Sequence, residues 1–232
     1  MPSNFRKALI VGAGSGLSAA LARAFARAGL TVALAARTPD KLASLAAETG
    51  AKTFRCDAAR RDDVQALFAA VTAAAGEPDV VVYNASYRQR APFIELEPAE
   101  VERSLAVTAF GAFLVAQEAV RRMLPHEHGA VLFTGASASV KGYALSAPFA
   151  MGKFALRGLA QSMARELAPK GIHVAHFVID GGIRSDRRPA TPDRPDSLLD
   201  PDAIAASYLH VLQQPRSAWT WEVELRPWTE AF

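Results

Sequence analysis

The sequence has a single cysteine, Cys56, which excludes an internal disulfide framework and favours a reducing compartment. It has no stretch of 18 residues without a charged side chain, so we expect no membrane-spanning helix. The two signs of charge nearly balance, because 26 basic and 23 acidic residues leave a formal net charge of only +3. The basic residues are too scattered to form a face for nucleic acid. The first residues lack the apolar core of a signal peptide, and a cytoplasmic protein is expected.

A cluster of metal ligands is also missing from the sequence. His173 and His176 lie on opposite faces of one expected strand, and no group of cysteines or carboxylates accompanies them. The sequence therefore predicts no metal site.

What the sequence does contain is an alternation of strands and helices. Short apolar segments predict seven buried strands, and helical patterns separate most of them. This alternation is typical of an α/β fold, in which helices cover both faces of a doubly wound parallel sheet. We expect one domain over residues 1–232. The expected strands are 8–11, 30–36, 51–56, 79–83, 130–135, 172–179 and 219–225, and the longest expected helices are 99–124 and 149–167.

A glycine-rich loop follows the first expected strand, between Gly12 and Gly16, and a helical pattern begins at Leu17. Glycine lets backbone N–H groups and a helix N-terminus approach an anion closely, so Gly12, Ser15, Gly16 and Leu17 are candidate phosphate-binding residues. Such a loop alone also fits an ordinary tight turn. The strand and helix alternation around it favours a nucleotide.

The ends of the second and third expected strands carry further candidates. Arg37 follows a strand that ends in Ala36, so this position offers a guanidinium for a 2′-phosphate and no carboxylate for a free ribose hydroxyl. NADP(H) is therefore favoured over NAD(H), although a solvated arginine is the alternative. Asp57 is a candidate acceptor for the adenine amino group, or a cap of the next helix.

Several of these features together resemble the short-chain dehydrogenase/reductase (SDR) family, over about residues 5 to 226. The motifs that carry the resemblance are Gly12-x-x-x-Gly16, Cys56-Asp57, Asn84-Ala85, Phe110-Gly111-Ala112-Phe113 and Lys153. Ser18 stands where the family has its third glycine, so one small residue replaces another.

The resemblance implies one Rossmann-type domain with about seven parallel strands, an NAD(P) cofactor, and hydride transfer to or from a small-molecule substrate. It implies that Asn84, Lys153, Gly181 and Ile183 also contact the cofactor. Two long helices pair subunits in this family, which implies a homodimer or homotetramer. Residues 184–199 correspond to its mobile substrate loop, and the arginines there suit an anionic compound, although charged loops are usually just solvated.

The catalytic residues depart from the family pattern. The family places a tyrosine four residues before the lysine, a serine thirteen before the tyrosine, and an asparagine on the long helix. With Lys153 as the lysine, these positions hold Phe149, Ala136 and Thr108. The usual tyrosine transfers the proton, the lysine lowers its pKa, and the serine hydrogen-bonds the substrate oxygen. Losing a positioned general acid costs roughly 10²–10⁴-fold in rate.

Other groups near this position are candidate substitutes. Ser137 is the preferred oxygen donor, although adjacent strand residues face opposite ways unless the strand end is bulged. Tyr143 and a water held by Lys153 are alternatives. Lys153 can hold the nicotinamide ribose without taking part in catalysis. Asp180 replaces the family's proline and is either a proton carrier or a turn-capping carboxylate.

The sequence thus leads to two hypotheses. The first is an NADP(H)-dependent short-chain oxidoreductase that acts on a small carbonyl, imine or alkene with a rerouted proton donor. The alternative is a catalytically silent protein that binds NADP(H) as a sensor or scaffold.

Overall fold

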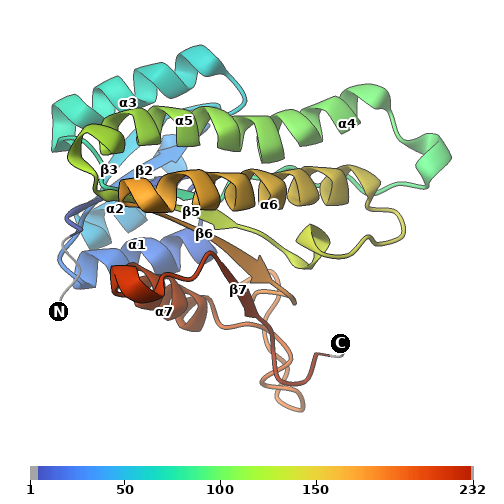
Figure 1. Ribbon diagram of the computed structural model, residues 1–232. Coiled ribbons are helices and arrows are strands. Elements are labelled where there is room, and N and C mark those ends of the chain that lie inside the picture. Colours follow the sequence, from blue (N-terminus) through green and yellow to red (C-terminus); the bar gives the residue numbers. More distant parts are fainter. Residues whose placement is uncertain (1–4, 231–232) are drawn as a thin grey trace.

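A computed structural model describes residues 5–230, and its centre is one sheet of seven parallel strands (Figure 1). The strands lie in the order β3-β2-β1-β4-β5-β6-β7, and every neighbouring pair is parallel. The expected doubly wound α/β sheet is therefore confirmed. The strands are β1 (Lys7–Val11), β2 (Thr31–Ala36), β3 (Lys52–Arg55), β4 (Val80–Tyr83), β5 (Gly129–Thr134), β6 (Ile172–Ile179) and β7 (Glu222–Leu225).

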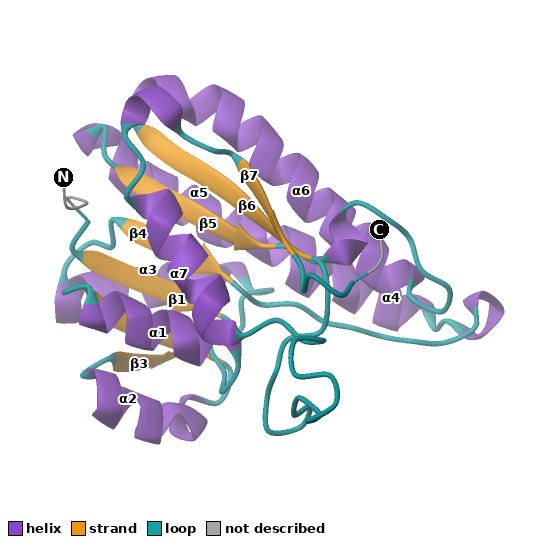
Figure 2. Cartoon of the chain, turned by 90° about the horizontal axis from the view of Figure 1, so that it is seen from below, coloured by secondary structure: helices purple, strands orange, loops and turns teal. Residues whose placement is uncertain are grey.

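Helices cover both faces of the sheet (Figures 1 and 2). One face carries α1 (Leu17–Arg27), α2 (Ala43–Thr49) and α7 (Pro201–Leu212). The other face carries α3 (Arg61–Ala75), α4 (Pro98–Leu105), α5 (Gly111–Met123) and α6 (Ala147–Leu167).

The apolar strands follow from this two-sided covering, as β1 illustrates. Ala8 and Ile10 belong to the core under α1 and α7, whereas Leu9 and Val11 belong to the core under α3, α5 and α6. Successive side chains of a strand point to opposite faces, so a strand covered on both faces must be apolar throughout. Among residues 5–230, no helix combines the length and apolarity needed to cross a membrane.

The expected helix over residues 99–124 is wrong in one respect. A π-helical turn, Ala106–Phe110, separates α4 from α5. The hydroxyl of Thr108, on this turn, accepts a hydrogen bond from the backbone N–H of Tyr87 at 3.2 Å. Gly152 of α6 lies so close that a Cβ there would be 2.9 Å from the Thr108 Cβ. The wider turn thus brings Thr108 into contact with two neighbouring segments.

The last strand is shorter than expected, because it begins at Glu222 and the residues Trp219 and Thr220 bond to Gln214 instead of pairing with β6. The backbone N–H of Thr220 donates to the Gln214 side-chain oxygen at 2.9 Å, and the Trp219 indole donates to the Gln214 carbonyl at 3.3 Å.

All seven strands run the same way, so their carboxyl ends share one edge of the sheet. Figure 2 shows the long loop between β6 and α7, which includes residues 184–199, beyond this edge. Ligands of open α/β sheets bind at this edge, and the candidate residues lie there.

Candidate active site

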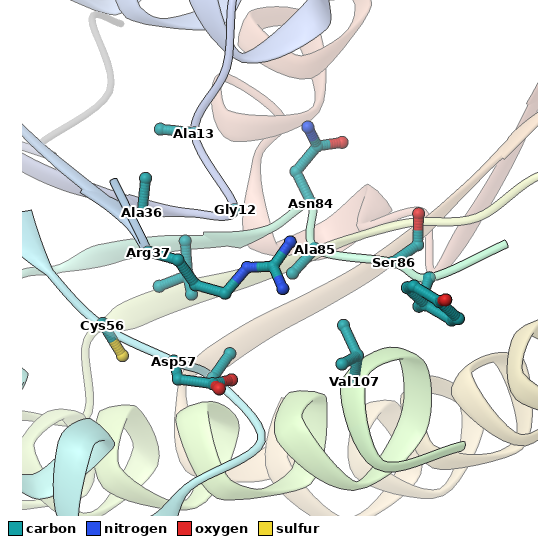
Figure 3. Close-up of a pocket in the computed structure, with 13 residues that line it drawn as sticks. Gly12, Ala13, Ala36, Arg37, Cys56, Asp57, Asn84, Ala85, Ser86 and Val107 are labelled. Carbon is teal, nitrogen blue, oxygen red and sulfur yellow. The ribbon is translucent and has the colours of Figure 1, made fainter. Parts of the chain in front are cut away.

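The glycine loop lies at the carboxyl end of β1 and borders a cleft of about 230 Å³, which we call the glycine-loop cleft (Figure 3). Gly12 has a φ of +85°, and a Cβ there would lie 2.4 Å from the backbone nitrogen of Ala85. Only glycine fits this close approach. A Cβ at Gly14 or Gly16 would meet nothing within 4 Å, so these two positions face open space.

Four predicted cofactor residues meet in this cleft, namely Gly12, Arg37, Asp57 and Asn84. Figure 3 shows the Arg37 side chain extending into the space between Asn84 and Asp57. The Asp57 carboxylate also accepts from the backbone N–H of Ala59 at 3.1 Å, so it forms a local turn as well as lining the cleft. The remaining predicted cofactor residues lie close by. Ser15 lines an adjoining cavity with Arg37 and Lys41, and Gly16 is the N-cap of α1. The Leu17 side chain belongs to the core, so only its backbone is available to a ligand.

Ser18 has a role that the sequence did not indicate. The Asn84 amide donates to the Ser18 hydroxyl at 2.6 Å, and this hydroxyl donates to the Gly12 carbonyl at 3.1 Å. These two bonds connect the end of β4 to the glycine loop. Replacing a glycine by serine keeps the position small and adds this connection.

A second cavity of about 450 Å³ lies at the carboxyl ends of β5 and β6, and we call it the Phe149 cavity. Five predicted residues line it: Ala136, Ser137, Phe149, Gly181 and Ile183. Tyr143, an alternative from the sequence, lines it too. Arg88, Ser146, Arg188 and Glu230 also line this cavity.

Both Ala136 and Ser137 reach this cavity because β5 ends at Thr134 and a 3₁₀ turn begins at Ser137. The alternation of side chains along a strand therefore does not separate these two residues. The Ser137 side chain also lies beside the Asp180 carboxylate and lowers the pKa of that group.

Asp180 is only 2% exposed and lies among cationic groups. Its carboxylate pairs with the Lys141 ammonium at 3.3 Å and with the Arg226 guanidinium at 2.9 Å. Burial alone would raise the pKa of this carboxyl, but the polar Ser137 side chain and the two cations outweigh burial and hold the pKa below its ordinary value. Asp180 is therefore a carboxylate at neutral pH.

Lys153 lies behind the wall of the Phe149 cavity and lines neither cavity. It is 3% exposed, its Nζ donates to the Thr134 carbonyl at 2.6 Å, and this Nζ lies 5.7 Å from the centroid of the Phe149 ring. Both Thr134 and Phe149 line the cavity. Burial lowers the pKa of Lys153 to about 7. Its ammonium form is thus only partly populated at neutral pH.

A buried hydrogen-bonded chain supports the floor of the same cavity. The His176 Nδ1–H donates to Glu222 at 3.0 Å, and Glu222 also forms a bidentate pair with Arg157 at 2.6 and 2.7 Å. Burial lowers the pKa of His176 to about 4, so the ring is neutral and its Nε2 accepts from the Ser139 hydroxyl at 3.3 Å. Ser139 in turn accepts from the backbone N–H of Ala136 at 3.1 Å. His176 thus holds the turn that carries Ala136.

His173 does not face His176. Its ring stacks on Trp219 with 4.5 Å between centroids and hydrogen-bonds the Thr220 carbonyl at 2.9 Å. Within the described part of the chain, no three or more histidine, cysteine, aspartate or glutamate side chains are placed to hold a metal ion.

Comparison with known families agrees with this arrangement. A model of the family described as short chain dehydrogenase matches residues 6–194. The chain belongs to the short-chain dehydrogenase family. Its relatives are oxidoreductases, and family membership therefore assigns this chain to the oxidoreductases.

Three relatives illustrate the similarity. The D-threitol dehydrogenase of Mycolicibacterium smegmatis is 31% identical over 172 residues, a match that spans 72% of this chain and 66% of that enzyme. A short-chain dehydrogenase structure from Rhodopseudomonas palustris is 36% identical, with a TM-score of 0.83 and coverage of 96% and 99% of the two chains. A metagenomic short-chain oxidoreductase in complex with NADP is 28% identical, with a TM-score of 0.83 and coverage of 96% and 97%.

Proposed function

We propose that this short-chain dehydrogenase is an NADP(H)-dependent oxidoreductase that acts on a small carbonyl, imine or alkene. The observation that carries the proposal is the open glycine loop, where Gly14 and Gly16 face empty space beside Arg37. A dinucleotide phosphate suits this loop because its backbone N–H groups and the start of α1 favour an anion. The NADP in the metagenomic relative is further support.

The residues of the two cavities fit an extended dinucleotide. Arg37 would pair with the 2′-phosphate and Asp57 would accept from the adenine amino group. The backbone at Gly12, Ser15, Gly16 and Leu17 would face the phosphates, and Asn84, Gly181 and Ile183 would border the nicotinamide ribose and ring. Lys153 lies behind the cavity wall, and its Nζ would have to leave the Thr134 carbonyl to reach the ribose. When bound, the cofactor supplies or accepts the hydride.

We assign Thr108, Ala136, Phe149 and Lys153 to the positions of the family's asparagine, serine, tyrosine and lysine. Phe149 has no hydroxyl, so the proton of the reaction must come from another group. Ser137 lines the cavity and lies beside Asp180, whose carboxylate holds the Lys141 ammonium at 3.3 Å.

This arrangement provides a proton path for carbonyl reduction. As hydride reaches the carbonyl carbon, Ser137 gives its proton to the oxygen and regains one through Asp180 from Lys141. The Lys141 side chain is 39% exposed, so solvent can return the proton to it.

Cofactor binding tests the first part of the proposal. NADPH, NADP⁺ and NAD⁺ are titrated by calorimetry into the wild type, into Arg37→Ala, and into Arg27→Ala as a control at the far end of α1. We expect Arg37→Ala to lose preference for NADP⁺ over NAD⁺ by about 10-fold or more, since a charged hydrogen bond contributes about 1.5–3 kcal/mol. An unchanged preference in Arg37→Ala would refute the role of Arg37.

Turnover tests the proton path. A panel of carbonyls, imines and alkenes is screened for oxidation of bound NADPH. For a substrate so found, Ser137→Ala should lower kcat by about 10²-fold or more without changing NADPH affinity, and Ser137→Thr should restore part of the rate. Equal kcat values in Ser137→Ala and the wild type would exclude Ser137 as the donor.

One observation favours the alternative, a catalytically silent NADP(H)-binding protein. Lys153 donates to the Thr134 carbonyl behind the cavity wall, and the aromatic ring in front of it has no hydroxyl. NADPH binding without turnover, with no carbonyl reduction gained in the double variant Phe149→Tyr and Ala136→Ser, would support this alternative.

We also propose that the protein is a homodimer or homotetramer that pairs through its long helices. Four large apolar side chains of this region are substantially exposed, and Phe154 is 46% exposed. Two of them stack on each other with 6.1 Å between ring centroids. The four are Phe110 in the π turn, Phe113 in α5, and Met151 and Phe154 in α6.

A further inference from the structure

Two arginines from distant parts of the sequence line the Phe149 cavity. Arg88 comes from the loop after β4, and Arg188 comes from the long loop after β6. The Arg88 guanidinium lies 5.4 Å from the centroid of the Phe149 ring. A Cβ on Gly182 would lie 2.4 Å from Nη1 of Arg188, so the absence of a side chain at Gly182 makes room for this guanidinium.

Neither arginine is neutralised by a neighbouring acid. None of the ion pairs among residues 5–230 includes Arg88 or Arg188. Nearby carboxylates have other partners, because Asp180 pairs with Lys141 and Arg226.

Two acids of the long loop and of the start of α7 also have partners of their own. Asp200 pairs with Arg184 at 2.6 Å, and the Asp196 carboxylate accepts from the Trp228 indole at 3.2 Å. Of the described residues that line the cavity, Glu230 is the one acidic residue.

The lining of the cavity is therefore positive. An arginine stays protonated at any ordinary pH, and its planar fork matches a carboxylate or phosphate. The remaining polar lining includes the neutral hydroxyls of Ser137, Tyr143 and Ser146, which suit an uncharged oxygen of the same ligand.

We propose that Arg88 and Arg188 form an anion-binding subsite, so that the substrate is a small carbonyl or alcohol that also carries an anionic group. This inference rests on the proposed oxidoreductase function of the Phe149 cavity. The arginines hold the anionic end, and the reacting oxygen lies at the hydroxyl-lined part with Ser137. A small oxo acid or hydroxy acid is the chemical class that meets both requirements.

Binding of matched neutral and anionic probes tests the subsite without turnover. The full-length protein is first saturated with NADP⁺, and butyrate, butyramide and inorganic phosphate are titrated into it by calorimetry. Butyrate and butyramide have similar shapes and differ in charge. We expect butyrate to bind about 10-fold or more tightly than butyramide, and the difference to shrink as salt is added. Tighter binding of phosphate than of butyrate would assign the subsite to phosphorylated substrates.

Variants identify the residues responsible. Arg88→Gln and Arg188→Gln should each weaken butyrate binding about 10-fold and leave butyramide binding unchanged. Arg187→Gln, which changes the neighbour of Arg188 that does not line the cavity, is the matched control. Melting temperatures of all three variants show whether a loss reflects misfolding, and Arg88→Lys should keep part of the affinity because it retains the charge.

The outcomes separate this inference from the proposed function. Absence of NADP⁺ binding would refute the proposed function. NADP⁺ binding together with equal affinities for butyrate and butyramide would refute the subsite alone. A loss of NADP⁺ affinity in Arg188→Gln, with butyrate affinity unchanged, would overturn the subsite by assigning Arg188 to the cofactor.

Discussion

The buried amine of Lys153 makes the stability of the protein depend on pH. This side chain is 3% exposed, and its one hydrogen bond goes to the Thr134 carbonyl. None of the ion pairs in the described chain includes it. Burial lowers its pKa from 10.5 to about 7, because no carboxylate pairs with the ammonium to offset its lost hydration. The folded protein therefore loses this proton near neutral pH, whereas the unfolded chain keeps it until pH 10.5.

The sign of the effect follows from the proton count. Between about pH 7 and pH 10.5 the unfolded chain binds one proton more than the folded protein, so the free energy of unfolding rises with pH. With the pKa at about 7, this group contributes a rise of about 3 kcal/mol between pH 6 and pH 9. Below pH 7 the proton is bound in both the folded and the unfolded chain, so the free energy of unfolding is lowered by the full cost of burying the ammonium charge.

Replacing Lys153 by methionine should remove this dependence. Lys153→Met keeps the length of the side chain, and the loss of the bond to Thr134 costs the same at every pH. Urea unfolding of the cofactor-free protein, followed by tryptophan fluorescence at pH 6 and pH 9, measures the difference. We expect the wild type to gain about 3 kcal/mol more than Lys153→Met between the two pH values.

The control is Lys170→Met, because Lys170 is an exposed lysine that pairs with Glu166 on the surface. Its pH dependence should match that of the wild type. If wild type and Lys153→Met gained the same free energy between pH 6 and pH 9, the reasoning from burial would be wrong.

Three further variants test packing and assembly. Gly135→Ala should lower the free energy of unfolding by about 1–3 kcal/mol in a urea titration, because its Cβ would lie 2.4 Å from His176 Nε2; unchanged stability would contradict this fit. Glu222→Gln removes the carboxylate shared by Arg157 and His176 and should cost about 1–3 kcal/mol by the same measurement, and a cost near zero would mean that the chain is not structural. Phe154→Glu should convert the oligomer to monomers in sedimentation equilibrium, whereas an unchanged mass would place the interface elsewhere.

The fold was predictable because its signals are local. The alternation of apolar segments and helical patterns predicted the parallel sheet, and the glycine loop predicted the turn between β1 and α1. The close approach of Gly12 to Ala85 is the physical reason for glycine there, since a Cβ would overlap the backbone. The position of Arg37 at the cleft follows from its place directly after β2.

Side-chain directions could not be predicted in the same way, because residues far apart in the sequence decide them. Ser137 lies beside Asp180, which comes from another strand end and is 43 positions away in the sequence. The π turn at Thr108 depends on contacts with Tyr87 and α6. From the sequence, Arg188 was one of several arginines in residues 184–199 and Arg88 had no expected role, since only the folded chain brings the two to one cavity.

The pH behaviour of Lys153 also relates stability to the proposed function. The form that would hold a ribose hydroxyl by charge is the ammonium, and this form declines as the pH rises above about 7. The same rise in pH stabilises the fold, because the neutral amine costs less to bury. Folding and cofactor binding through this residue therefore respond to pH in opposite directions. An apolar residue at position 153 would remove the cost to the fold, so the fold itself does not require a lysine there. The proposed role of Lys153 in holding the cofactor would account for an amine at this position.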